Sequence, residues 1–180
     1  MNSFHKIYFG AGCFWCSEAV LKNVIGIESL SVGYMGGDSN VIPSYKNVCA
    51  GKNGYIEVVE VCYNLNLISL EVLVDIFMHI HDPTSEDKQG NDVGIQYRSV
   101  VFCDNDKQID SIKKILADFN KQKIWPDPIV TKVLVASKYY RAEEGHQEYY
   151  SKNPQNPYCS ILIPPKVKKI KEKYRDYFKS

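Results

Sequence analysis

The sequence predicts a single α+β domain, a two-layer sandwich in which helices pack on a mixed, mainly antiparallel sheet. Strand-like and helix-like segments alternate along the chain, with spacings that allow hairpins. A length of 180 residues with 44% hydrophobic residues is enough to bury a core, so residues 1–180 are expected to form one domain. The turn Gly10-Ala11-Gly12 lacks the complete dinucleotide fingerprint, and there is no Walker lysine. Neither a dinucleotide-binding site nor a P-loop nucleotide site is therefore predicted.

The predicted strands are short runs rich in β-branched and aromatic residues. They cover residues 5–9, 27–34, 55–63, 98–103 and 129–135. Apolar residues at helical spacing predict helices at about 16–24, at 70–80 after an N-cap at Ser69, and at 106–121. The tail is expected to form a last helix that opens at Pro164, because proline suits a first helical turn. From about residue 140 the C-terminal segment is expected to extend around the core.

Two long polar stretches interrupt this pattern, at residues 36–54 and 81–96. Loops of such length in a compact domain are usually functional. Both are therefore expected to contribute to a site.

The charge balance excludes several classes of partner. A formal net charge of +1 and a pI of about 7.6 provide no overall field for nucleic acid or an anionic membrane. No apolar run approaches the roughly 18 residues of a membrane span. The first residues lack the charged and apolar regions of a secretory signal. We therefore expect a cytoplasmic protein that binds neither nucleic acid nor membrane.

Six cysteines in a chain without a signal are poor support for a disulfide scaffold. Cys62 and Cys103 lie in strand-like runs and are expected to be small buried hydrophobes. Nothing local activates Cys49, and His79 and His146 have no partner that the sequence identifies. The thiols with chemical interest are those of Cys13, Cys16 and Cys159.

The stretch from Gly12 to Glu18, Gly-Cys-Phe-Trp-Cys-Ser-Glu, contains the strongest candidate site. A thiol at a helix N-terminus faces unpaired backbone N–H groups and the positive end of the helix dipole, which favour thiolate. Cys13 is thus a candidate nucleophile. Phe14 and Trp15 leave a glycine turn together and cannot both face one buried side, so at least one is expected to line a pocket.

Two thiols three residues apart allow three kinds of chemistry. Half of a zinc site is one, but no second Cys-x-x-Cys or His pair follows, so we expect no metal. A thioredoxin-like dithiol is another, with Phe14 and Trp15 in place of the usual Gly-Pro. The third is reduction of a small polar group, with Cys13 oxidised and another thiol resolving it.

Several segments, in order along the chain, resemble the peptide methionine sulfoxide reductase A family. The first is the stretch from Gly12 to Glu18. The others are Val32-Gly33-Tyr34-Met35-Gly36-Gly37, Pro43-Ser44-Tyr45, Gly54-Tyr55-Ile56-Glu57-Val58-Val59, His81-Asp82-Pro83-Thr84, the run of residues 89–99, Asn153-Pro154 and Tyr158-Cys159. The matches extend from residue 8 to about 165. Tyr55 replaces the usual histidine of the family.

The resemblance implies that the Cys13 thiolate attacks the sulfur of a methionine S-sulfoxide. Expelling the oxygen needs a proton, and Glu57 matches the family's acid. Desolvation on a strand beside an apolar pocket should raise the pKa of this carboxyl. Glu57 and Glu60 differ in strand parity, so only one of them can face a pocket.

Other roles also follow from the resemblance. Tyr45 and Tyr97 match tyrosines that hydrogen-bond the sulfoxide oxygen, and phenols donate without net charge. Asp92 matches a residue that holds this polar network. Phe14 and Trp15 match the aromatic cup for the methyl group of the substrate.

The sulfenic acid left on Cys13 is expected to condense with a second thiol. Cys159 matches the family's resolving cysteine, and Cys16, where the family more often has glycine, is an alternative resolver or a relay. The resemblance implies a thioredoxin as reductant and no cofactor. We expect a monomer. The alternative hypothesis is a non-catalytic redox-sensing or thiol-exchange protein that uses Cys13 and Cys16 alone.

Overall fold

The computed structural model describes residues 3–180, and six strands of this part form one sheet. Their order is β7-β6-β1-β3-β2-β8, and all neighbours are antiparallel except β6 and β7. The predicted α+β class with a mixed, mainly antiparallel sheet is confirmed. The strands are β1 Phe4–Ala11, β2 Ile27–Met35, β3 Ile56–Asn64, β6 Ser99–Cys103, β7 Lys132–Val135 and β8 Tyr140–Arg141.

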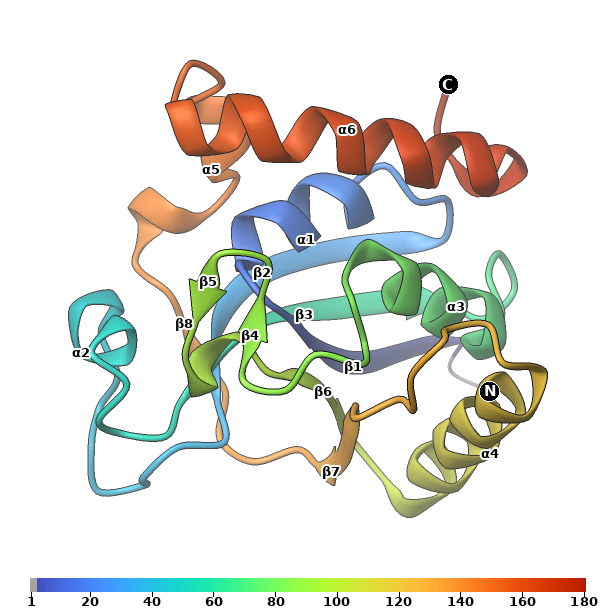
Figure 1. The fold of residues 1–180 in the computed structure, drawn as a ribbon, viewed down its shortest axis with the longest axis horizontal. Coiled ribbons are helices and arrows are strands. Elements are labelled where there is room, and N and C mark those ends of the chain that lie inside the picture. Colours follow the sequence, from blue (N-terminus) through green and yellow to red (C-terminus); the bar gives the residue numbers. More distant parts are fainter. Residues whose placement is uncertain (1–2) are drawn as a thin grey trace.

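Helices pack on one face of this sheet, and α1 lies between the sheet and α6 (Figure 1). The long helices are α1 Phe14–Leu21, α3 Leu70–Ile80, α4 Asp106–Gln122 and α6 Pro157–Lys173, and the short ones are α2 Tyr45–Cys49 and α5 Tyr149–Lys152.

Alternation along the strands separates the two faces of the sheet. Ile7 and Phe9 of β1 point to the helices, where Phe9 stacks on Phe77 of α3 with ring centroids 4.4 Å apart. Tyr8 points to the opposite face, which is covered by a smaller apolar cluster that includes Tyr139 from the coil before β8. The architecture is therefore the predicted two-layer sandwich.

The helix starts follow from their caps. Ser69 caps α3 by accepting from the Val72 N–H, as predicted, and Asn105 caps α4 by accepting from the Gln108 N–H. Helix α1 begins at Phe14, earlier than predicted.

The last helix does not open at Pro164. It begins at Pro157, because the Asn156 side chain accepts from the N–H groups of Tyr158 and Cys159. Pro157 therefore occupies the first turn, where a missing N–H costs nothing, while Pro164 and Pro165 lie inside the helix. This places Cys159 on a helix rather than on an extended tail.

The two long loops contain short elements that the sequence pattern did not indicate. Helix α2 lies within residues 36–54, and the hydroxyl of Tyr55 donates to the carbonyls of Asp38 and Val41 to hold this loop on β3. A hairpin of β4 Lys88–Gln89 and β5 Asp92–Val93 lies within residues 81–96, followed by the short 3-10 helix η1 Ile95–Tyr97. Both loops lie at the same side of the molecule as the start of α1 (Figure 1).

The C-terminal end returns to the connection between α1 and β2. Ile25 N–H donates to the Tyr177 carbonyl at 2.7 Å, and Lys179 N–H donates to the Asn23 carbonyl at 2.8 Å. The segment after β8 thus contacts both ends of α1 before the chain ends. Among residues 3–180, no helix has the length and apolarity that crossing a membrane would require.

Candidate active site

Cys13 follows the end of β1 after Gly12 and is the N-cap residue of α1. The turn depends on Gly12, whose φ of +81° is unfavourable for other residues. A Cβ on Gly12 would also lie 2.8 Å from the side chain of Gln89 in β4. Gln89 itself is bonded to the backbone of Asp82 through both its oxygen and its nitrogen. The loop 81–96 is therefore packed tightly against the candidate nucleophile.

The thiols of Cys13 and Cys16 are hydrogen bonded to each other. This bond and burial raise the pKa of Cys13, although the N–H groups of Cys16 and Trp15 oppose the increase. The same bond lowers the pKa of Cys16, and the positive charge of Lys166 lowers it further. The predicted effect of the helix N-terminus is present in these two N–H groups, and the hydrogen bond between the thiols provides a path for the Cys13 proton.

Cys159 completes a group of three thiols. It is fully buried on α6 and shares an apolar cluster with Cys16, Ala19 and Ile163, against which Cys13 packs. Burial, and the nearby Cys13, raise its pKa. The six cysteines are all reduced in this structure. The three thiols that the sequence singled out are thus brought together.

Glu57 lies on β3, on the helix side of the sheet, and is only 2% exposed. Its carboxylate accepts a hydrogen bond of 3.0 Å from the N–H of Phe14, the residue next to Cys13. Burial raises the pKa of Glu57 well above its usual range, and the nearby Cys13 raises it further. Glu60 points to the other face and pairs with Lys6 at 3.2 Å. The two carboxyls therefore face opposite sides of the sheet, as their positions along the strand predicted, and Glu57 is the buried one.

Tyr45 and Tyr97 come from the two long loops and lie near Glu57. Burial raises the pKa of both phenols, and the Glu57 carboxyl raises it further, so both stay protonated donors at neutral pH. Tyr45 is held by its backbone N–H, which donates to Glu143 at 2.8 Å. Its hydroxyl is hydrogen bonded to Cys49, the last residue of α2.

Asp92 lies on β5, and its carboxylate accepts a hydrogen bond from the hydroxyl of Tyr158 on α6. The contact links the loop 81–96 to the helix that carries Cys159. The expected partners of Asp92 were the tyrosines near the sulfoxide oxygen, whereas the partner in the structure is Tyr158. Asp92 and Tyr158 line a cavity with Cys13.

Phe14 is buried and Trp15 is half-buried, so Trp15 is the one with an exposed surface. Trp15 stacks on Tyr149 at 3.9 Å between ring centroids, and its indole N–H donates to Nδ1 of His146 at 3.3 Å. His146 also lies 4.2 Å from the Tyr45 ring. These rings form an aromatic wall beside Cys13.

His146 and Tyr149 were missed as site residues. Burial lowers the pKa of His146, which keeps its Nδ1 able to accept from the indole of Trp15. The density of aromatic residues from 139 to 150 was the available signal. His79 also has partners, because it contacts Asp75 and Tyr174 at the C-terminal end of α3.

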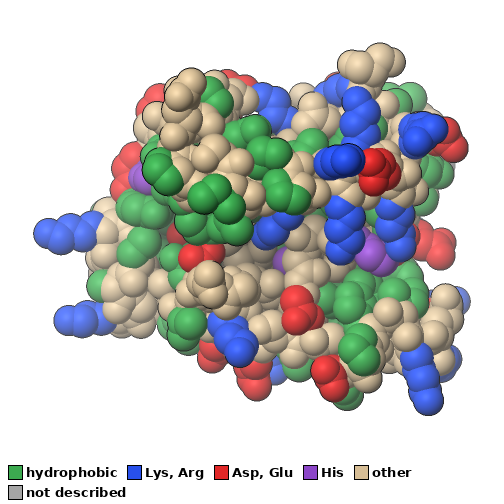
Figure 2. Space-filling view, turned by 45° about the horizontal axis from the view of Figure 1, so that its top comes forward, with side chains coloured by type: hydrophobic (Ala, Val, Ile, Leu, Met, Phe, Trp, Pro, Cys, Tyr) green, Lys and Arg blue, Asp and Glu red, His purple; other side chains and the backbone are tan. Residues whose placement is uncertain are grey.

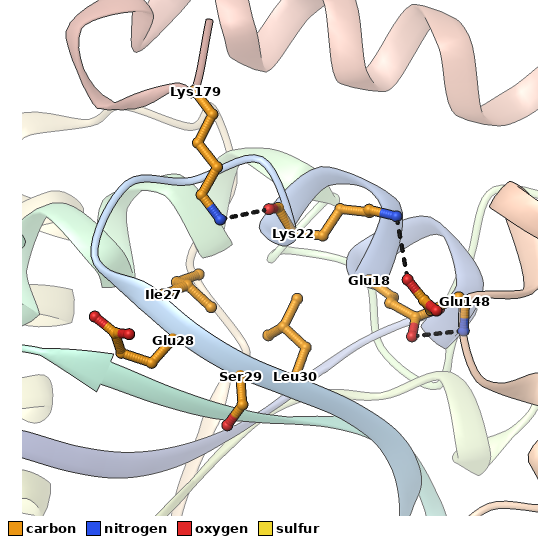
Figure 3. Close-up of a pocket in the computed structure, with 8 residues that line it drawn as sticks. All are labelled: Glu18, Lys22, Ile27, Glu28, Ser29, Leu30, Glu148 and Lys179. Carbon is orange, nitrogen blue, oxygen red and sulfur yellow. Dashed lines mark hydrogen bonds and ion pairs between the residues drawn. The ribbon is translucent and has the colours of Figure 1, made fainter.

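Glu18 connects this wall to α1. Its buried carboxylate accepts from the N–H of Glu148 at 2.9 Å, and Lys22 pairs with the Glu148 side chain at 3.5 Å (Figure 3). Burial raises the pKa of Glu18. Glu148 has a left-handed backbone, with φ of +52°, directly before α5. The Glu18 bond thus fixes the start of the helix that carries Tyr149.

Within residues 3–180, no group of three His, Cys, Asp or Glu side chains is arranged to hold a metal ion. The site combines three thiols, a buried carboxyl with a raised pKa, two phenols and aromatic rings. Such a set can deliver a sulfur nucleophile and a proton to one small polar group beside an apolar wall.

Comparison with known proteins gives a consistent result. The family model described as peptide methionine sulfoxide reductase matches residues 5–178. Peptide methionine sulfoxide reductase MsrA from Trichodesmium erythraeum is 45% identical over 170 residues, which cover 94% of this chain and 96% of that protein.

Solved structures show the same fold. Methionine sulfoxide reductase A of Corynebacterium diphtheriae has a TM-score of 0.81 at 32% identity, covering 91% of this chain and 84% of that one. Mxr1 from Saccharomyces cerevisiae in complex with Trx2 has a TM-score of 0.56 at 26% identity, covering 82% and 85%. The chain belongs to the peptide methionine sulfoxide reductase family.

Proposed function

We propose that this chain reduces the S epimer of methionine sulfoxide to methionine, with Cys13 as nucleophile and Glu57 as proton donor. As a member of its family it is an oxidoreductase, a peptide methionine sulfoxide reductase. The observation that supports these roles best is the position of Glu57. Its carboxyl is buried, has a raised pKa, and is bonded to the residue next to Cys13. We further propose that residues 1–180 act as one domain, as a monomer, in the cytoplasm.

In the proposed first step the Cys13 sulfur bonds to the oxidised sulfur of the substrate. The Cys13 proton moves to Cys16, which is hydrogen bonded to it. Glu57 gives its proton to the sulfoxide oxygen, and the phenols of Tyr45 and Tyr97 stabilise this oxygen by donation. The sulfur–oxygen bond of the substrate then breaks, and the released hydroxide attacks the Cys13 sulfur and breaks the sulfur–sulfur bond. The products are methionine and a sulfenic acid on Cys13, so the substrate is reduced by two electrons and Cys13 is oxidised by two.

In the second step a thiol attacks the Cys13 sulfenic acid, which gives a disulfide and water. Cys16 and Cys159 are the candidates. Cys13 is the N-cap and has non-helical backbone angles, so a bond to Cys16 does not require the helix to unwind. Cys16 is therefore proposed to react first and to relay the disulfide to Cys159. Thiol–disulfide exchange with a thioredoxin then restores the thiols, which the Mxr1 complex with Trx2 supports.

The aromatic wall accounts for substrate selection. The terminal methyl group of methionine sulfoxide is small and apolar, and the exposed face of Trp15 beside Phe14 offers it an aromatic surface. Because Glu57 and the wall lie at fixed positions around Cys13, only one arrangement of methyl group and oxygen at the sulfur fits both. This is the basis for consumption of a single epimer.

The contact between Cys13 and Cys16 also favours a second candidate, a thiol-exchange protein without sulfoxide chemistry. A single-turnover reaction without reductant, given a peptide with the S or the R sulfoxide and followed by disulfide mapping, separates the two. We expect one methionine per chain from the S epimer only, with Cys13 bridged to Cys16 or Cys159. Failure to consume either epimer would leave the thiol-exchange function.

A further inference from the structure

A cavity of about 640 Å³ opens on Cys13 and runs away from the aromatic wall. Asp92 and Tyr158 line it near Cys13, and His79 and Trp125 line it at the far end. Its long side is α6, whose residues turn toward it at intervals of one helical turn. Figure 2 shows this hollow on the face of the molecule, with Lys and Arg side chains along its upper border. The cavity is therefore a groove that begins at the candidate nucleophile.

Positive charge lines one side of the groove. Lys166 and Lys169 line it from α6. Within residues 3–180, neither lysine forms an ion pair, whereas the outward Lys168 pairs with Glu172. The groove also contains two carboxylates. Asp92 accepts from Tyr158 and Asp82 accepts from Thr84, and within residues 3–180 neither forms an ion pair with a lysine.

We propose that this groove binds the segment of an oxidised polypeptide that flanks the methionine sulfoxide, and that it favours segments with acidic side chains. The inference rests on the proposed reaction at Cys13. A sulfoxide seated at Cys13 leaves its own backbone at the mouth of the groove, so the adjoining residues of the same polypeptide can enter it. Carboxylates then meet the two free ammonium groups.

Helix geometry gives the register of this preference. Lys166 and Lys169 follow Tyr158 by about two and three helical turns, which corresponds to about 12 and 16 Å along α6. An extended peptide advances about 3.3 Å per residue. The favoured acidic side chain therefore lies about four or five residues from the sulfoxide, and only one of these two positions faces α6 at a time, because successive side chains of an extended peptide point to opposite sides. Leu162 lines the groove between Tyr158 and Lys166 and offers an apolar contact to the residues in between.

The test compares peptides that carry one methionine S-sulfoxide and either Glu or Gln at the fourth and fifth positions, on the N-terminal or the C-terminal side. The rate constant for sulfoxide loss is measured in single turnover, without thioredoxin, at low salt and at about 0.5 M salt. Partly exposed charge pairs contribute modestly, so a three- to tenfold faster reaction of one Glu peptide is expected at low salt. The difference should shrink at high salt.

The matched variants are Lys169→Gln and, as control, Lys168→Gln, which removes the same charge from an outward position of α6. Lys166 is kept, because its charge lowers the pKa of Cys16. The first variant should weaken the preference for Glu and the control should keep it. Equal rates for all peptides with the native chain, or a preference that is unchanged in the first variant, would overturn the proposal. A defect of that variant confined to turnover with thioredoxin would also overturn it, in favour of a thioredoxin contact. Reduction of free methionine sulfoxide by every variant shows separately that the reaction itself is intact.

Discussion

Replacing Glu57 by glutamine tests the proposed proton transfer with little change of shape. The amide oxygen can still accept from the Phe14 N–H, which now lies 3.0 Å from the carboxylate. The amide cannot act as a general acid, however, so the proton that Glu57 would donate is lost. General acids contribute about 10²- to 10⁴-fold, so sulfoxide reduction should slow by that factor, which corresponds to about 3 to 6 kcal/mol of barrier at about 1.4 kcal/mol for each tenfold. Single-turnover rates with the S epimer measure it.

The control is Glu60→Gln, which removes a carboxyl of the same strand from the opposite face. This change should alter the rate less than twofold. A rate for Glu57→Gln within threefold of the native chain would refute the role of Glu57 as acid, because the amide cannot supply that proton.

The pH profile gives an independent readout of the same carboxyl. The acid form of Glu57 is the active form, and burial raises its pKa. Activity should therefore persist well above the pH at which an exposed glutamate ionises and fall as the pH rises through the raised value. Stability has the same sign: the neutral buried form favours folding at low pH, and its contribution is lost as the pH rises through the folded-state pKa. Both dependences should be absent in Glu57→Gln.

Three further changes probe the surroundings of Cys13. Gly12→Ala forces a positive φ on alanine and a clash with Gln89, so it should lower the free energy of unfolding by about 1 to 3 kcal/mol in denaturant titration. His146→Phe keeps the ring but removes the acceptor for Trp15, so KM for the sulfoxide peptide should rise more than kcat falls in steady-state assays. Cys16→Ser should prolong the lifetime of the sulfenic acid on Cys13, measured with a dimedone trap; an unchanged lifetime would show that another thiol resolves it.

The sheet could be predicted from sequence because its strands carry local signals. Runs of β-branched residues predicted the ends of β2 and β3 to within one residue of those observed. The alternation of side chains along a strand placed Glu57 and Glu60 on opposite faces of the sheet. The ends of helices were less predictable. Pro164 suggested a start, but the cap provided by Asn156 decides where α6 begins.

The reactive residues of the site were predictable in part, and the aromatic wall was not. Cys13 and its neighbours form one compact motif whose residue types predict thiol chemistry. The contacts of His146 with Trp15 and Tyr45 join segments more than one hundred residues apart, and no spacing rule connects them. Likewise, the pKa shifts of Cys13 and Cys16 depend on their mutual hydrogen bond, and that of Cys16 depends also on the charge of Lys166, which only the folded chain brings near.

The burial of Cys159 bears on the proposed recycling of the site. The Cys159 side chain is 0% exposed, so the proposed exchange with a thioredoxin would require the first part of α6 to leave α1. Pro164 and Pro165 lack N–H groups, and the helix therefore lacks two backbone hydrogen bonds between its two halves. The half that carries Cys159 is separated by this break from the half that is fixed by Ile170 and Tyr174 in the core. Opening that exposes Cys159 thus costs least at the prolines, while the lysine side of the groove stays in place.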